Sequence, residues 1–465
     1  MASEESNATS RPEKHRVGRL LRNGILLLLL LIGAGIAYLH RPRAEMIREL
    51  AALKARGYKT SLLELETEQR ILPDDRNLSV AVIDAATDLE EGWSKPLDKR
   101  EDGPANESPG LETINAWRSF VTNHVDFFER GQAFAQREPG GPRLNYMAGS
   151  MMLLPSLSKY REVARAYSYR ARLAGEEGRP ADAAADILTM LRISRCTEDE
   201  PILISQLVRI AICSSAAKTA EKILNRVAMS EATLDQLQSG FLRVADQKLM
   251  HSALSGELAI GVAAFSNGAE GMITAMGDMD SNPGGNGVPL SKAGVYLYAG
   301  LGFLKDEQAI HVHMLSRMME ILRMPHWEQE GPMQTWERDL QQMTSHWRPG
   351  ALFSPRILPA LSNASKREGD HLAQMQVTVA GIAVERYRAA HGGSLPETLQ
   401  QLVPAQLAAV PLDPFDGKPL RYAKLGGNSW VVYSVGPDRT DDAGAERRKG
   451  ASKAPYDVTF GVERD

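Results

Sequence analysis

The sequence predicts a mainly α-helical protein with one transmembrane helix near its start and a small α+β unit at its end. Three features support this prediction. An uncharged apolar run spans Gly24–Leu39, apolar residues recur at helical spacing through the middle of the chain, and turn residues separate two β-like runs near the C-terminus. We expect a basic cytoplasmic tail at 1–23, a transmembrane anchor at 24–40, a domain of helical hairpins at 44–347, a linker at 348–366 and a C-terminal domain at 367–465.

The composition of the 465 residues is that of an ordinary globular protein, with 43% hydrophobic and 24% charged residues. The net charge of −4 and the absence of a basic stripe with interleaved aromatic residues give no reason to expect a nucleic-acid partner. Two cysteines, Cys196 and Cys213, are too few for a disulfide scaffold. Because both lie in helical patterns, we interpret them as small buried apolar residues. A disulfide or a reactive thiol is the alternative.

The apolar run Gly24–Leu39 is the predicted membrane anchor. A bilayer core of about 30 Å needs about 20 apolar residues in a helix, so this run is slightly short by itself. Tyr38 and the long side chains of Arg22 and Arg41 extend it to the two interfaces. The alternative is a cleaved signal peptide, for which Gly35-Ile36-Ala37 offers a small-x-small site.

The orientation of the anchor follows from the charges around it. Five basic residues precede the run and four follow it closely, so the positive-inside rule decides little. A tail with five cationic groups is costly to translocate, which favours a cytoplasmic N-terminus. We therefore expect a single-pass protein of the inner (plasma) membrane whose C-terminal part is extracytoplasmic, or periplasmic. A cytoplasmic body is the alternative.

The middle of the chain reads as a series of helices. Ser156–Gly175 and Ala181–Arg195 form a helical hairpin, which resembles a single tetratricopeptide-type repeat or is a generic hairpin. Pro201–Val227 is long and strongly apolar, which predicts a central core helix. We expect Ser230 to cap the helix that follows it. Asn267–Leu290 is rich in Gly, Asn, Asp and Met and predicts a long exposed loop, and Lys292–Met324 returns to a helix.

The pattern changes after Asp370. His371–Ala390 predicts one amphipathic helix that ends at Gly392-Gly393. Two β-like runs follow, Pro419–Ala423 and Ser429–Val435, and the glycine-rich turn between them suits a hairpin. We expect Trp430 to lie in the core of this short antiparallel sheet.

Four segments of the C-terminal region occur in a characteristic order, namely AVERYRAAHGGSLP, VPLDPFDGKPLRY, WVVYSVGPDRTDDAG and YDVTF. In this order they resemble the globular domain of the major pseudopilin of bacterial type II secretion systems, over residues 367–465. The resemblance implies a helix packed on a short antiparallel sheet, Ca²⁺ in the last loop and a link to a secretion apparatus. The rest of the chain resembles bacterial membrane-anchored helical proteins of this layout.

The chain also departs from the pseudopilin pattern. It lacks a Gly-Phe-Thr-Leu-x-Glu processing site, because Arg22-Asn23 precedes the apolar run. Residues 41–366 separate the membrane segment from the pseudopilin-like domain, whereas the pilin helix runs directly from one to the other. We therefore expect a pilin-type domain attached to a helical membrane protein, and we do not expect a polymerising subunit.

The resemblance implies a set of Ca²⁺ ligands. Asp438 matches the Asp of the family's Gly-x-Asp, Asp457 matches its terminal Asp, and Ser434 matches its Ser, while Asp441 and Asp442 lie in the loop between. Ca²⁺ prefers six to eight oxygen ligands. Glu446–Lys449, which carries three cations, is an insertion relative to the family and weakens the site. A solvated acidic turn is the alternative.

The sequence carries no common nucleotide, zinc-protease or hydrolase motif, and we assign no catalytic residue. The first hypothesis is a membrane-anchored interaction or assembly protein that binds other proteins. The second is an enzyme with its site near Glu307 and His311, which are four residues apart, or in the loop 267–290. Asp278-x-Asp280-x-Asn282 imitates the start of an EF-hand loop, but Pro283 and Pro289 occupy positions that need other residues.

Overall fold

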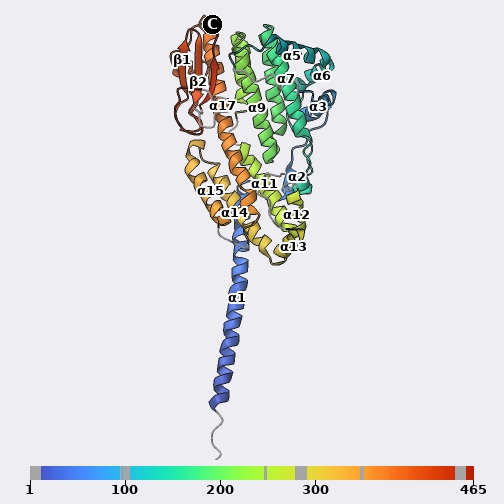
Figure 1. The fold of residues 1–465 in the computed structure, drawn as a ribbon, viewed down its shortest axis with the longest axis vertical. Helices are drawn as coiled ribbons and strands as arrows, with labels where there is room; N and C mark the ends of the chain where they lie inside the picture. Colours follow the sequence, from blue (N-terminus) through green and yellow to red (C-terminus); the bar gives the residue numbers. More distant parts are fainter. Residues whose placement is uncertain are drawn as a thin grey trace, which may run out of the picture.

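A long helix projects from one end of an elongated helical body, and a small sheet lies at the other end (Figure 1). The computed structural model describes residues 12–94, 97, 105–245, 249–277, 291–345, 350–445 and 457–464. Within the projecting helix, side chains are described at 22–30 and from Arg43 onward. The first eleven residues of the predicted cytoplasmic tail lie outside these ranges.

The first half of the chain is helical. Its α-helices are α1 (Pro12–Ala55), α2 (Leu62–Glu68), α3 (Leu78–Ala85), α5 (Leu111–Asn123), α6 (Val125–Arg130), α7 (Ser156–Glu176), α8 (Pro180–Ser194) and α9 (Leu203–Leu224). Short 3₁₀ helices connect them: η1 (Ala86–Asp88), η2 (Gly131–Gln136), η3 (Tyr146–Met151) and η4 (Arg195–Thr197).

The second half continues as helices and closes with the sheet. Its helices are α10 (Glu231–Leu242), α11 (Leu249–Ser266), α12 (Gly268–Gly277), α13 (Lys292–Gly300), α14 (Phe303–Ile321), η5 (His326–Glu328), α15 (Glu330–Ser345), α16 (Ser354–Ile357), α17 (Pro359–Ala390) and η6 (Leu399–Leu402). The strands are β1 (Arg421–Gly426), β2 (Ser429–Ser434) and β3 (Val458–Val462). A mainly helical chain with a small antiparallel sheet near the C-terminus is thereby confirmed.

The predicted helical hairpin is α7 and α8. Pro180 is the first residue of α8, where a missing N–H costs nothing, and Gly178 supplies the positive φ of 69° that the turn requires. Both helices pack on α9, so one apolar core runs through the three. The next helix begins as predicted, because the Ser230 hydroxyl accepts the N–H of Thr233 at 3.2 Å and caps α10.

α17 joins the helical part to the sheet. It begins at Pro359, not at His371, and its 32 residues contact α9, α10, α11, β2 and β3. The segment expected as a linker is described from Gly350 onward. It contains α16 and the first turns of α17, with Leu358 fully buried. Prolines at the first positions of α16 and α17 start these helices. The two predicted domains therefore share a core across α17.

The sheet has the order β1-β2-β3, and both pairs are antiparallel. Trp430 pairs with Val462, and Val432 lies between Tyr422 and Phe460. Trp430 is fully buried, in agreement with its predicted core position. The inner face of the sheet packs on α17 at Gly381, whose Cα lies so close to Phe460 and Trp430 that a Cβ would collide with both rings.

α1 contains the predicted membrane segment at 24–40. Its aliphatic side chains from Ile25 to Leu30 are 52–64% exposed, and this part of the helix extends away from the body (Figure 1). The last turns of α1 pack on α14. There Glu49 contacts His313 at 2.7 Å, and Leu53 is 1% exposed.

In a search of the described residues, one helix has the length and composition to cross a membrane. This helix is α11, half of which is buried inside the protein. Its inner face packs on α14 and α9. A long apolar helix in the core of a globular protein has the same composition, so α11 gives little support to a membrane location.

The predicted loop at 267–290 is helical in its first part. α12 spans Gly268–Gly277, and Met272 is 1% exposed in a small core with Phe265 and Val295. The prediction from composition was wrong for this part of the stretch. Residues distant in sequence form a core in which Met272 is buried, and this tertiary packing favours the helix. Residues 278–290, including the EF-hand-like Asp278 to Asn282, lie outside the described residues. The predicted helix from Lys292 is broken at Gly302, where φ is 85°.

Candidate functional site

Asp457 is the centre of the predicted Ca²⁺ site. It is 4% exposed, and its Oδ2 accepts the N–H of Gly444 at 2.7 Å. Its Oδ1 is buried without a hydrogen-bond partner in the described part of the chain. Burial raises the pKa of Asp457. The backbone N–H groups of Gly444 and Asp442 oppose this effect, and the nearby carboxylates of Asp442 and Asp441 add to it. A cation at this point would reduce the electrostatic repulsion among the three neighbouring carboxylates.

The other two predicted ligands are engaged elsewhere. The Asp438 side chain is exposed and accepts the N–H of Thr440 at 3.1 Å, which closes a tight turn. The Ser434 hydroxyl is fully buried and donates to Oδ1 of Asp413 at 2.8 Å. Asp441 and Asp442 thus lie near enough to Asp457 to affect its pKa, whereas Ser434 bonds a different carboxylate.

Asp413 is a residue that the site prediction missed. It is fully buried and accepts the N–H groups of Phe415 at 2.9 Å and Val435 at 2.8 Å. Arg421 donates to it at 2.5 Å and also bonds Asp416. Asp413 thus ties the turn before β1 to the end of β2. The signal in the sequence is an aspartate between two prolines, a position that favours a side chain bonded to its own turn.

The fit of this region to Ca²⁺ is partial. Across the residues that the structure describes, no group of three or more His, Cys, Asp or Glu is arranged to hold a metal ion. Residues 446–456, including the basic insertion Glu446–Lys449, lie outside those ranges. The observation that favours a cation is the buried Oδ1 of Asp457, which has no hydrogen-bond partner among the described residues, since a buried anionic oxygen is costly without a partner.

Glu307, the acid of the alternative enzyme site, is a structural anchor. Its carboxylate is fully buried and accepts the Tyr298 hydroxyl at 2.9 Å. It also accepts the backbone N–H groups at the start of α16, namely those of Leu352, Phe353 and Ser354. These bonds satisfy groups that a helix start leaves free. His311 is buried one turn later, over Gly261 and edge-on to the ring of Phe265, and burial lowers its pKa to about 4.

Two other glutamates cap helices in the same way. Glu257 of α11 accepts the N–H of Leu203 at 2.9 Å, at the start of α9. Glu368 of α17 accepts the N–H of Met250 at 2.8 Å, at the start of α11. Because a carboxylate at a helix N-terminus also interacts favourably with the helix dipole, these contacts join helices that are far apart in sequence.

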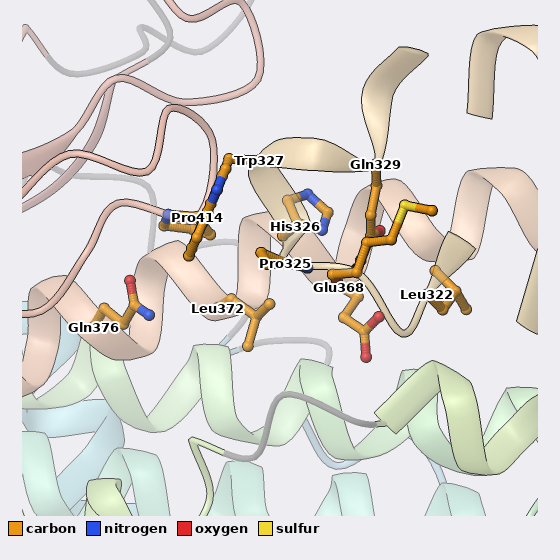
Figure 2. A pocket seen from close by; sticks show the side chains of 10 residues that line it. Leu322, Pro325, His326, Trp327, Gln329, Glu368, Leu372, Gln376 and Pro414 are labelled. Carbon is orange, nitrogen blue, oxygen red and sulfur yellow. The ribbon is translucent and has the colours of Figure 1, made fainter. Parts of the chain in front are cut away.

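A small cavity of about 50 Å³ lies between α17 and the segment around η5 (Figure 2). Figure 2 shows His326 above α17, between Trp327 and Gln329, with the Glu368 carboxylate directed to the other side of the helix. The His326 ring packs against Gly369 and lies 5.5 Å from the ring of Phe415. Burial lowers the pKa of His326 to about 4, and Arg439 adds to this effect. The volume suits a few water molecules.

A larger hollow of about 300 Å³ lies between η3, α11 and α12, beside the loop named in the enzyme hypothesis. Its wall is mostly small and apolar. The charged group in the wall, Glu270, accepts the hydroxyl of Tyr296.

Cys196 and Cys213 are both buried and free, so the disulfide alternative is wrong. Burial raises the pKa of each thiol, which disfavours the reactive thiolate.

Comparison of the chain with protein-family models, with curated proteins and with solved structures finds no match.

Proposed function

We propose that this chain is a membrane-anchored interaction or assembly protein that holds a pseudopilin-like unit away from the bilayer. The observation that carries the proposal is the run of exposed aliphatic side chains from Ile25 to Leu30 on the projecting part of α1. A soluble protein rarely exposes so large a continuous apolar surface, and lipid is the environment that suits it. In this proposal the body is extracytoplasmic and the chain crosses the inner membrane once.

The arrangement of α17 supports a role in presenting the sheet. This helix runs from the end of the body near α1 to the sheet at the far end (Figure 1). It is packed on both sides by other elements. A continuous buried helix transmits position with little flexibility, so the C-terminal loops would lie at a fixed height above the membrane. That geometry suits the binding of another protein, and the resemblance to a pseudopilin suggests a partner in a secretion or pilus-type apparatus.

The anchor is tested with the full chain expressed in a Gram-negative host. We expect the protein to remain in the membrane pellet after alkaline carbonate extraction, and a Leu28→Arg, Leu29→Arg variant to be released. The matched control Leu111→Arg changes an exposed leucine on the body and should stay in the pellet.

Intact mass decides between the anchor and the signal peptide, because a chain beginning near Ala37 would overturn the proposal. Labelling of Leu111→Cys by an impermeant maleimide in cells with a permeabilised outer membrane reports the orientation.

We also propose that the loop 436–445 and Asp457 bind Ca²⁺. The support is the buried Oδ1 of Asp457 beside the carboxylates of Asp441 and Asp442. A ligand that binds only the folded state stabilises it by about 2.7 kcal/mol at one hundred times its Kd. We therefore expect the melting temperature of the detergent-solubilised chain to rise on addition of Ca²⁺ and to rise less with Mg²⁺.

The matched variants are Asp457→Asn and Asp74→Asn, which remove one negative charge each. Asp74 is exposed and lies far along the chain from the loop. The Ca²⁺-dependent rise should disappear in Asp457→Asn and persist in Asp74→Asn. An equal rise in both variants would show that Ca²⁺ acts elsewhere, and no rise in the unaltered chain would refute the site.

A further inference from the structure

The outer face of α13 is mostly apolar, and the described part of the chain leaves it uncovered apart from the hydrogen bond from the Tyr296 hydroxyl to Glu270. Ala293, Tyr296, Leu297, Gly300 and Leu301 recur at the spacing of one helix face, and all five are exposed. Tyr296, Leu297 and Leu301 are 49%, 66% and 62% exposed, respectively. The opposite face packs Val295 into the core formed with Phe265 and Met272. This short helix therefore has two apolar faces, and the protein interior covers one of them.

The position of α13 identifies the environment of its outer face. α13 leads directly into α14 through Gly302, and α14 lies along the last turns of α1. Glu49 contacts His313 and Arg56 contacts Glu320, with the same separation of 264 residues. α1 and α14 therefore run parallel, and neighbouring positions keep a constant offset of 264 residues. The same offset places Phe303, the first residue of α14, at the height of position 39 in α1.

Position 39 is the body-side end of the proposed membrane segment. α13 precedes Phe303, so it lies at the height where the hydrocarbon gives way to the lipid headgroups. Figure 1 agrees, because α13 is at the end of the body from which α1 leaves. Tyr296 suits this depth, since tyrosine is enriched at membrane interfaces. Lys292, the first residue of α13, and Lys305, in the first turn of α14, are exposed, and cationic groups at this height attract anionic headgroups.

We propose that the outer face of α13 lies in the lipid interface and forms a second membrane contact beside α1. The inference rests on the proposed anchor, because α1 sets the height of the bilayer. Two contacts on different helices would hold the body in one orientation, whereas a single helix would let it tilt. The occupant of the uncovered face is thus a lipid surface. An interface helix of this kind buries its apolar face about 5–10 Å into the headgroup boundary.

The test uses the full chain in vesicles of phosphatidylcholine and phosphatidylglycerol that contain a nitroxide-labelled lipid. A fluorescent maleimide is attached at Leu297→Cys, at Leu28→Cys in α1, or at Leu111→Cys in α5. The native cysteines are buried and remain unlabelled in the folded protein. Leu111 is 78% exposed and α5 lies at the end of the body away from α1 (Figure 1), so it is the matched control.

We expect the label to be quenched at 297 and at 28, and to be unaffected by the nitroxide at 111. Quenching at 28 together with none at 297 would overturn the second contact and leave the anchor intact. No quenching at either position would overturn both. If the unlabelled Leu297→Cys variant forms a disulfide-linked dimer in vesicles, and the label on a separately labelled sample is not quenched, a second copy of the chain covers the face and the lipid proposal is wrong.

Discussion

Gly381 lies where α17 and the sheet come closest. Replacement by alanine would bring a methyl group against the rings of Phe460 and Trp430, and both rings are fixed in the core. We expect Gly381→Ala to lower the free energy of unfolding by about 1–3 kcal/mol, the usual cost of an overpacked core. Urea unfolding followed by circular dichroism measures this loss.

The control for this variant is Gly331→Ala near the start of α15. There a Cβ meets no atom within 4 Å, and alanine favours the helix by up to about 1 kcal/mol. Gly331→Ala should therefore be neutral or slightly stabilising. If Gly381→Ala were equally harmless, the sheet would have to shift away from α17 at little cost, and the close packing of the two would not matter for stability.

Single residues also show how far the sequence allowed prediction of the site. The position of Trp430 was predicted because an aromatic residue in a β-like run next to a hairpin turn belongs in a core. The proximity of Asp441 and Asp442 to Asp457 came from a family resemblance. The engagement of Ser434 by Asp413 was not predicted, because these residues are 21 positions apart and only the fold brings the two side chains together.

Helix ends illustrate the same limit at the level of elements. Ser230 was predicted as a cap because the cap and the capped N–H are three residues apart. The start of α9 is capped by Glu257, which is 54 residues away, and the start of α16 is capped by Glu307, which is 47 residues away from Ser354. Such tertiary caps leave no local pattern. The start of α17 was missed for a related reason, because its first turns are stabilised by burial against α15 and α16.

The acid stability of the whole molecule depends on its buried histidines. Burial lowers the pKa values of His311, His326 and His371 to about 4, and Arg209 adds to the effect at His371. In the unfolded chain each would have a pKa near 6.5. Between pH 6.5 and 4 the unfolded state therefore binds more protons than the folded state. The stabilising contribution of each neutral histidine is complete above pH 6.5 and is lost as the pH falls toward 4.

Each histidine can change the free energy of unfolding by at most about 1.4 kcal/mol per pH unit in this window. Glu200 acts in the opposite sense, because burial raises its pKa to about 7 and stability falls as the pH rises from 4.5 to 7. Asp186, Glu257 and Glu385 act in the same sense as Glu200, because burial raises their pKa values as well. The histidines are therefore tested through the change that each variant makes in the slope of stability against pH, which urea unfolding at pH 7, 6 and 5 measures. His371→Gln should reduce the slope by up to about 1.4 kcal/mol per unit, whatever its effect at pH 7. His326→Gln should do the same, and the two effects should add, since independent sites add.

An unchanged slope in both variants would mean that these rings gain protons in the folded state as readily as in the unfolded chain. The interior around them would then have to admit water, contrary to the close packing of His326 on Gly369 and the burial of His371.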